Sequence, residues 1–575
     1  MKNFIKKHFL AFIFAFAVGI VMALPQILLM LNPAYEGIAF TGSDSEEYYN
    51  GRIQEIYDGN YTANNHDLYE YKNTPYAQPS LPEIIVAFSG KALWLTSSQI
   101  ISLGKFMFPF FLYIILYFLV LQISKKSLLS LAAPAAIILG SQFIFSPTSI
   151  FSFLTFQVAA IQNISPYARP INPEVSSVIF FLWLFIFLKW LYNKKLSYFI
   201  FSTVLFSSFI YVYVYSWMLS LVFVAVLFML YLVKARKYLN FSIIWFALML
   251  FISVLASIPY WINYFHLIQS PWYDLLQKHY GFYKSHAPVW SNLLFLDFIL
   301  LFFMYWKKEK DVAFYFFLSL FSSLFIVINQ QVITGMRFYP GHWHWYYATP
   351  LSIIMLLWFL ESLISKFREI FARILLLCVV AISFTFGVVN HYNFYLIHKI
   401  DYLPYQGYAK VFEWLNENTK KDDVVLTHDA LNLYLPIYTN NNSYISTWGQ
   451  LYLVPEERFY DMAFAQFYLD RVDEKNIDIY FARDQRFVRM LSLGYYKMRT
   501  GECQDGQCIT DEDRAKIKEK YLDFYKNADK EKFFKKYKLD YVVWDPGSQP
   551  FWRIDTYKIF SFVKEIEGVR IYKAL

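Results

Sequence analysis

Long apolar runs fill most of the first 400 residues of the chain, and short polar stretches separate them. A helix that crosses a bilayer needs about 20 mainly apolar residues, and these runs reach or approach that length. We expect about eleven spans, at Phe9–Leu31, Gly104–Ile123, Leu128–Phe145, Val175–Trp190, Leu196–Tyr215, Trp217–Val233, Phe241–Phe265, Leu293–Trp306, Val312–Ile328, Tyr346–Leu363 and Ile374–Asn390. The pattern predicts a mostly helical, polytopic membrane bundle.

Polarity changes near residue 398, which predicts a second unit after the bundle. Residues 1–398 would form the membrane domain, with a large first loop at 32–102, and residues 399–575 would form an α/β domain. In the second unit, helical patterns precede the apolar segments Val424–Leu426 and Tyr541–Trp544. This order predicts at least two parallel strands, and the last residues of the chain have the pattern of a closing hairpin.

Basic residues gather at alternate ends of the predicted spans. One set of ends carries sixteen of them, Lys2, Lys6, Lys7, Lys125, Lys126, Lys194, Lys195, Lys234, Arg236, Lys237, Lys307, Lys308, Lys310, Lys366, Arg368 and Arg373. The short loops on the opposite side carry four, Arg169, Lys278, Lys284 and Arg337. Because basic loops stay in the cytoplasm, we expect a multi-pass cell-membrane protein with a cytoplasmic N-terminus and an extracytoplasmic C-terminal domain.

Composition agrees with a membrane protein. Hydrophobic residues make up 57% of the chain and charged residues 17%, whereas about a quarter of the residues in soluble proteins are charged. The formal net charge of +8 is explained by the cytoplasmic loops. It therefore predicts no nucleic-acid partner.

The chain has three cysteines, and two of them are close in sequence. Cys503 and Cys508 close the short loop Cys-Gln-Asp-Gly-Gln-Cys in the predicted external domain, where a disulfide is stable. The alternative is half of a metal site. We favour the disulfide because no second Cys or His pair accompanies it.

An acidic cluster follows the first apolar run, where the chain leaves the bilayer. It contains Asp44, Glu46 and Glu47, and Tyr48, a candidate substrate-binding residue, comes directly after it. Carboxylates at this depth are suited to general-base catalysis on a membrane-embedded substrate, or to sharing a divalent cation such as Mg²⁺ or Mn²⁺. They would also suit the N-terminus of a helix as caps. Three carboxylates exceed what a cap needs, so Asp44 is our candidate base.

Basic and aromatic residues mark the other predicted external loops. Arg169 is flanked by prolines and suits a phosphate, although snorkelling to lipid headgroups or pairing with Glu174 would also explain it. His342 and His344 flank a tryptophan and lie shortly after Arg337, and His279 lies in another loop. The two flanking histidines would bind a diphosphate, move a proton or hold a metal with Asp44 or Glu47, or serve only as interfacial anchors. Arg337 and His279 would add positive charge for a phosphate.

Several of these segments together resemble the GT-C superfamily of membrane glycosyltransferases. The most specific are Gly42-Ser43-Asp44 with Tyr48-Tyr49, Arg169 with Asn172-Pro173, and Thr334-Gly335 through His342-Trp343. The C-terminal segment Trp414–Thr419 before Val424–Leu426 also resembles bacterial members. The subfamily stays unassigned, since the chain has no Trp-Trp-Asp triplet and Asp44 is followed by Ser45 instead of Glu.

The resemblance implies a polyprenyl-phosphate sugar donor at the outer leaflet, membrane lipids around the bundle, and a glycan, lipid or protein acceptor. Asp44 would be the base of an inverting transfer, with Glu46 and Glu47 beside it. Arg169, Arg337, His342 and His344 would hold the phosphate. Two alternatives remain: a lipid-linked polysaccharide polymerase or ligase, and a transporter or flippase without transferase activity. A transporter should carry charges at mid-membrane depth, whereas the charges here lie at the span ends.

Overall fold

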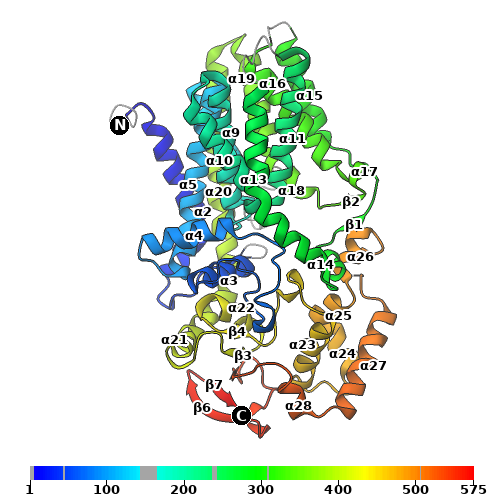
Figure 1. Ribbon diagram of the computed structural model, residues 1–575. Coiled ribbons are helices and arrows are strands. Elements are labelled where there is room, and N and C mark those ends of the chain that lie inside the picture. The colour runs from blue at the N-terminus through cyan, green and yellow to red at the C-terminus, as the bar shows by residue number, and fades with distance from the viewer. Residues whose placement is uncertain (1–5, 43–45, 143–164, 236–242, 307–309, 505–506) are drawn as a thin grey trace.

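The structure of this chain is a computed structural model in which three layers follow one another (Figure 1). It describes all residues except 1–5, 43–45, 143–164, 236–242, 307–309 and 505–506. A helical bundle forms one end, the helices of the first loop lie in the middle, and a sheet with its own helices forms the other end.

Each of the predicted apolar ranges overlaps one apolar helix of the bundle, and residues 143–145 and 241–242 of these ranges lie outside the described residues. These helices are α2 (Phe9–Met30), α5 (Ser97–Ser124), α6 (Ser127–Gly140), α9 (Glu174–Asn193), α10 (Leu196–Val212), α11 (Val214–Leu230), α13 (Ile243–Ile268), α15 (Asn292–Tyr305), α16 (Val312–Ile328), α19 (Thr349–Ser365) and α20 (Glu369–Tyr405). In the described residues, eight helices are long and apolar enough to cross a membrane, and three further apolar helices are shorter. The chain is a multi-pass membrane protein.

Aromatic side chains fill the centre of the bundle. Trp183 of α9 is fully buried, and its ring centroid lies 6.0 Å from that of Phe206 on α10 and 5.7 Å from that of Phe223 on α11. Lipid tails are as apolar as these rings, so close packing between helices, and not exclusion of water, holds such a bundle together.

Two of the helix boundaries that differ from the apolar pattern have a simple physical reason. Helix α5 begins at Ser97, seven residues before the predicted span, because Thr96 and Gln99 form a capping box there. Helix α20 has 37 residues and continues to Tyr405, past the predicted boundary at residues 398 and 399. Hydropathy marks where the apolar run ends. A helix can extend beyond that run as long as its backbone groups find hydrogen-bond partners.

The first loop folds into a layer between the bundle and the C-terminal part. It contains α3 (Glu46–Tyr57), η1 (Tyr69–Tyr71) and α4 (Leu81–Ala92). The buried guanidinium of Arg52 on α3 forms an ion pair with Glu83 on α4 at 2.6 Å and donates to the Ala63 carbonyl at 2.8 Å. Breaking a buried ion pair leaves an uncompensated charge, which costs much free energy. This pair therefore fixes α3 against α4.

The C-terminal part contains a five-stranded sheet of order β4-β3-β5-β7-β6. The strands are β3 (Val424–Leu426), β4 (Asn442–Ser443), β5 (Tyr541–Trp544), β6 (Phe560–Ile566) and β7 (Val569–Ala574). β3 is parallel to both β4 and β5, while β7 is antiparallel to β5 and β6. The predicted parallel strands and closing hairpin are both confirmed.

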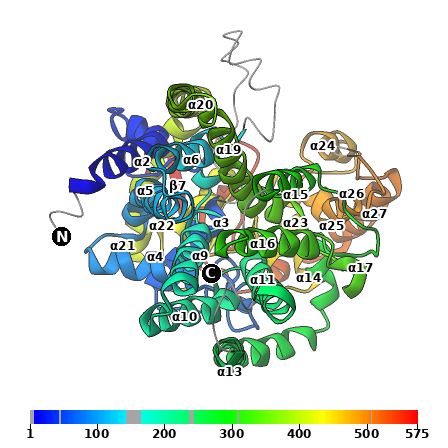
Figure 2. The same cartoon turned by 90° about the horizontal axis from the view of Figure 1, so that it is seen from above.

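Helices surround this sheet and extend beyond the bundle on one side (Figure 2). They are η6 (Gln406–Tyr408), α21 (Ala409–Asn418), α22 (Asp429–Tyr438), η7 (Gly449–Leu451), α23 (Glu456–Leu469), α24 (Ile477–Arg483), α25 (Arg486–Leu491), α26 (Gly494–Thr500), α27 (Asp511–Asn527), α28 (Lys530–Phe534) and η8 (Ile554–Thr556). Helix α22 packs against α3 of the first loop, and α26 contacts α14 (Tyr273–His279), which follows α13. The C-terminal part therefore touches two loops of the bundle.

Candidate functional site

A large cavity of about 1570 Å³ lies where the bundle, the first loop and the C-terminal part meet. Twelve tyrosines and four tryptophans are among the residues that line it. Rings of this kind provide flat apolar faces with polar edges. Such walls suit a ligand that has both an apolar chain and a hydroxyl-rich group.

The charged residues that line the cavity are all basic. Among the described residues they are four arginines, Arg169, Arg486, Arg489 and Arg499, and neither Asp nor Glu lines the cavity there. Guanidinium groups bind phosphate and carboxylate groups through paired hydrogen bonds. The cavity is therefore suited to an anionic ligand.

Arg169 reaches the cavity from the loop before α9. The short turn η3 (Pro166–Ala168) precedes it, and Ser165 ties this turn to α6 by donating to the Ile138 carbonyl at 2.7 Å. The Arg169 guanidinium donates to the Tyr346 hydroxyl at 3.2 Å and lies 5.5 Å from the centre of the Tyr49 ring. The loop thus presents the arginine between an aromatic face and a phenol.

His342 and Tyr213 meet in the same cavity. Tyr213 is extended, with φ of −165°, and this single residue separates α10 from α11. Its hydroxyl lies 2.6 Å from Nδ1 of His342 on α18 (Gly341–Trp343). The break between the two apolar helices thus places a phenol against the imidazole.

His344 is not placed like His342. It begins the π-helical turn η5 (His344–Ala348) and is not among the cavity-lining residues. Side chains two positions apart point in different directions on a helix, so the predicted pair does not share one face. Arg337 lies on the two-stranded ribbon of β1 (Tyr283–Lys284) and β2 (Met336–Arg337), over the Tyr283 ring, and it does not line the cavity either.

Tyr48 and His279, two further predicted binding residues, do line the cavity. Burial raises the pKa of Tyr48 to about 12, so its hydroxyl stays protonated. Burial lowers the pKa of His279 to about 4, despite hydrogen bonds with the backbone at Gln450 and Met490 that act in the opposite direction. A neutral imidazole cannot attract a phosphate by charge, which limits His279 to hydrogen bonding.

Two residues of the acidic cluster, Glu46 and Glu47, begin α3 and precede the cavity-lining Tyr48. Asp44 is outside the described residues, and Glu46 and Glu47 do not line the cavity, whereas the next residues, Tyr48 and Tyr49, do. The buried Glu46 carboxylate forms an ion pair with Lys105 of α5. Burial, with a smaller contribution from the charge of Glu46, raises the pKa of Glu47 to about 7.

No group of three or more His, Cys, Asp or Glu side chains arranged for a metal ion occurs in the described parts of the chain. A shared divalent cation would need Asp44, which those parts do not include. The cation therefore stays a prediction.

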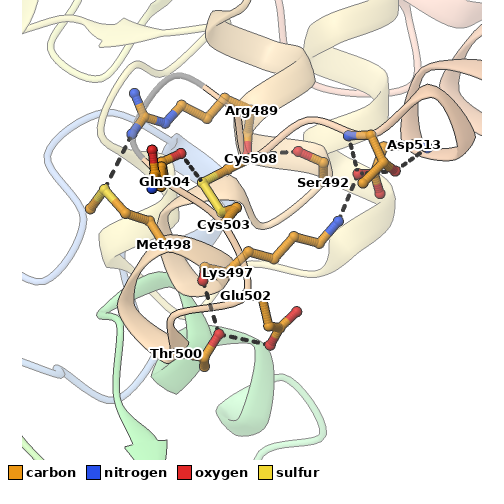
Figure 3. The surroundings of a disulfide bond; sticks show 11 residues. Arg489, Ser492, Lys497, Met498, Thr500, Glu502, Cys503, Gln504, Cys508 and Asp513 are labelled. Carbon is orange, nitrogen blue, oxygen red and sulfur yellow. Dashed lines mark hydrogen bonds and ion pairs between the residues drawn. A yellow bond between two sulfur atoms is a disulfide. The ribbon is translucent and has the colours of Figure 1, made fainter.

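The C-terminal part contributes Arg499, on α26, to the cavity. Its guanidinium carbon lies 3.7 Å from the centre of the Tyr339 ring, and it donates to the Tyr495 hydroxyl. Shortly after this helix, a disulfide joins Cys503 and Cys508, whose Cα atoms are 5.2 Å apart (Figure 3). Lys497 on α26 also pairs with Asp513 at 2.6 Å, so the helix is fixed at several points.

Sequence reasoning did not identify the arginines of the C-terminal part or Tyr213. The density of Arg and aromatic residues between Arg483 and Arg499, just before the cysteine loop, was the available signal. Tyr213 could not be recognised as a site residue from the sequence because it lies inside an uncharged apolar run. Both kinds of residue become functional candidates only through contacts with distant segments.

No family model matches the chain, and no curated protein matches it in sequence. Among solved structures, the chain is similar to that of ArnT from Cupriavidus metallidurans bound to undecaprenyl phosphate, with 9% identity and a TM-score of 0.43, over 97% of each chain. It is similar to the same protein in the apo state with the same identity and TM-score, over 97% of this chain and 98% of that one. At these values the similarity does not identify the chain.

Proposed function

We propose that this protein is a membrane glycosyltransferase of the GT-C type, which moves a sugar from a polyprenyl-phosphate donor to an acceptor on the extracytoplasmic face. The observation that carries the proposal is the cavity, which combines aromatic walls at the bundle with arginines and no acidic lining among its described residues. A lipid phosphate sugar has matching parts: an apolar chain, a phosphate and a sugar ring.

The apolar chain of the donor would enter beside α11 and α13. Trp217 and Met218 of α11 and Trp261 of α13 line this side of the cavity. Helix α13 is largely exposed on the outside of the bundle, since only 17% of its most apolar stretch is buried. Lipid would therefore surround it. A prenyl chain would pass from the bilayer into the cavity without crossing water.

The phosphate would lie near Arg169 and His342, at the polar end of the cavity. The acceptor hydroxyl oxygen would attack the anomeric carbon and give its proton to Asp44 as the new glycosidic bond forms. The bond from the anomeric carbon to the phosphate oxygen would break, and the phosphate would keep the electron pair. A single displacement of this kind inverts the anomeric configuration. Basic groups fixed around the phosphate would stabilise the charge that develops there.

The predicted topology completes the proposal. The alternation of basic loops supports a cytoplasmic N-terminus and an extracytoplasmic part from about residue 399 onward. The first loop and the C-terminal part, which together enclose the cavity, would then both face the outside. Lipid-linked sugars would be used there after they have crossed the membrane.

Donor turnover in membranes tests this function. Membranes that contain the protein, and matched membranes without it, are supplied with polyprenyl-phosphate sugars labelled in the sugar, and the free polyprenyl phosphate and the labelled products are separated and identified. We expect release of polyprenyl phosphate that depends on the protein, with label in a glycan, lipid or protein product. Movement of intact donor across the membrane without any such release would instead favour a flippase. The same assay in excess chelator, with and without added Mg²⁺ or Mn²⁺, tests the predicted cation.

A further inference from the structure

Arg499 has hydrogen-bonding capacity that the described chain does not use. Its Nε is buried and has no hydrogen-bond partner there, and its guanidinium forms no ion pair with any described carboxylate. Buried polar groups of folded proteins are nearly always satisfied, so an unsatisfied one calls for a ligand or another explanation. Arg499 lines the cavity, so a ligand there would contact its guanidinium through the terminal nitrogens, while Nε itself is buried.

Arg499 and Arg169 each contact a tyrosine whose ring packs on His342. The Tyr346 ring stacks on His342 with centroids 5.2 Å apart, and Arg169 donates to the Tyr346 hydroxyl. The Tyr339 ring meets His342 edge-on at 5.3 Å, and Arg499 lies over Tyr339. Both arginine charges act on His342. The loop before α9 and the C-terminal part therefore bring two cations to the same end of the cavity.

The position of Arg499 depends on close packing between α26 and the loop after α14. Gly281 lies in that loop with φ of +71°, and a Cβ atom built on it would lie 3.0 Å from Cγ of Arg499. The same atom would lie 2.8 Å from Cε1 of Tyr495, whose hydroxyl accepts from Arg499. There is no room for a side chain between the loop and the arginine. The loop therefore sets how far Arg499 extends toward His342.

We propose that Arg499 and Arg169 form a two-cation phosphate site, so that the C-terminal part supplies a binding residue for the donor. This inference rests on the proposed function and adds a residue and a charge requirement to it. The sugar ester of a polyprenyl phosphate is a phosphodiester with one negative charge. When the sugar leaves, the phosphate becomes a monoester with up to two. Arg169 would match the first charge, and Arg499 the charge that develops during transfer.

Ligand binding measured apart from turnover tests this site. Purified wild-type protein, Arg499→Gln, Arg499→Lys and the exposed control Arg483→Gln are titrated with polyprenyl phosphate, with the matching polyprenol and with inorganic phosphate. Binding is followed by tryptophan fluorescence, since Trp345 and Trp448 line the cavity. We expect Arg499→Gln to bind polyprenyl phosphate at least about 10-fold more weakly, the lysine variant to recover part of the affinity, and Arg483→Gln to match wild type.

The polyprenol separates a charge effect from a loss of fold. We expect polyprenol to bind all four proteins equally. Unchanged binding of polyprenyl phosphate to Arg499→Gln, or an equal loss for the alcohol, overturns the assignment of Arg499. If inorganic phosphate binds more weakly than polyprenyl phosphate, the result supports a site for the phosphate group of a lipid. If inorganic phosphate binds but the lipid does not, the result overturns that site. If wild-type protein binds polyprenyl phosphate but Arg499→Gln binds it equally well, only the Arg499 assignment fails. If wild type does not bind the lipid, the proposed donor itself fails.

Discussion

Lys105 of α5 forms an ion pair with Glu46 at the start of α3, and the two side chains are 11% and 1% exposed. The same ammonium donates to the backbone carbonyl of Phe40. One lysine of the bundle thus holds the chain on both sides of Asp44. We infer that this lysine fixes the described residues that flank the candidate base.

Removal of either partner of this ion pair should destabilise the protein. Glu46→Gln or Lys105→Met leaves one buried charge without compensation, which costs about 3–5 kcal/mol. The double variant removes both charges and should lose less stability than the sum of the two single changes. Thermal unfolding of the purified proteins in one detergent measures this. Single variants with wild-type melting temperatures would show that the pair does not hold the loop.

Glu47 should make stability depend on pH. Its pKa of about 7 in the folded protein lies above the ordinary value of 4.5, so the folded state keeps a proton that the unfolded state releases. The free energy of unfolding should therefore fall as the pH rises from about 4.5 to 7, and this cost is fully present above pH 7. Glu47→Gln should remove it and stabilise the protein at pH 8 by at most about 3 kcal/mol.

Melting temperatures at pH 5 and pH 8 check this prediction. The advantage of Glu47→Gln over wild type should be larger at pH 8 than at pH 5. Burial also raises the pKa of Asp58 to about 7. The stability of the variant will therefore still depend partly on pH. Glu36→Gln changes an exposed carboxylate of the same loop and serves as the matched control. An equal advantage at both pH values would mean that Glu47 is ionised throughout.

His342 and His344 should differ in their effect on donor turnover. His342→Ala removes the imidazole that contacts Tyr213 in the cavity, and we expect turnover to fall about 10-fold or more. His344→Ala should change turnover much less, because His344 does not line the cavity. The initial rate of polyprenyl phosphate release from each variant measures this. Equal losses would indicate a shared role, such as a common cation, which chelation would then reveal.

Sequence alone predicted the elements of this fold well because the bilayer imposes a simple pattern. In the described residues, every predicted apolar range overlaps one helix, and Val424–Leu426 and Tyr541–Trp544 are parallel strands in one sheet. These features depend on local composition. The end of α20 was missed since a helix outside the bilayer needs no apolar run.

The candidate site was less predictable because distant segments build it. Arg169 was recognisable from its prolines, whereas Arg499 looked like an ordinary basic residue of a surface helix. Its role at the site depends on contacts with Gly281 and Tyr339, which are far from it in the sequence. The sequence also does not determine whether the backbone at residues 342–344 is helical or extended. This conformation decides which histidine lines the cavity.

Gly281→Ala should weaken phosphate binding without removing a charge. The added methyl group would displace Tyr495 and Arg499, so we expect affinity for polyprenyl phosphate to fall about 5- to 10-fold. Gly568→Ala is the matched control, since its φ is also positive, at +87°, but no atom lies within 4 Å of the new Cβ. Both changes strain the backbone by about 1–2 kcal/mol. Equal affinities for the two variants would show that contact at Gly281 does not position Arg499.

Asp44 gives the most direct test of the central claim, that this protein is a glycosyltransferase with a general base after its first span. Wild type, Asp44→Asn and the control Glu36→Gln are compared in one reconstituted preparation, and each is measured for binding of polyprenyl phosphate and for turnover of its sugar ester. We expect Asp44→Asn to bind the lipid as wild type does but to turn the donor over about 100-fold more slowly or worse, while Glu36→Gln does both normally. Turnover by Asp44→Asn at the wild-type rate would contradict the central claim.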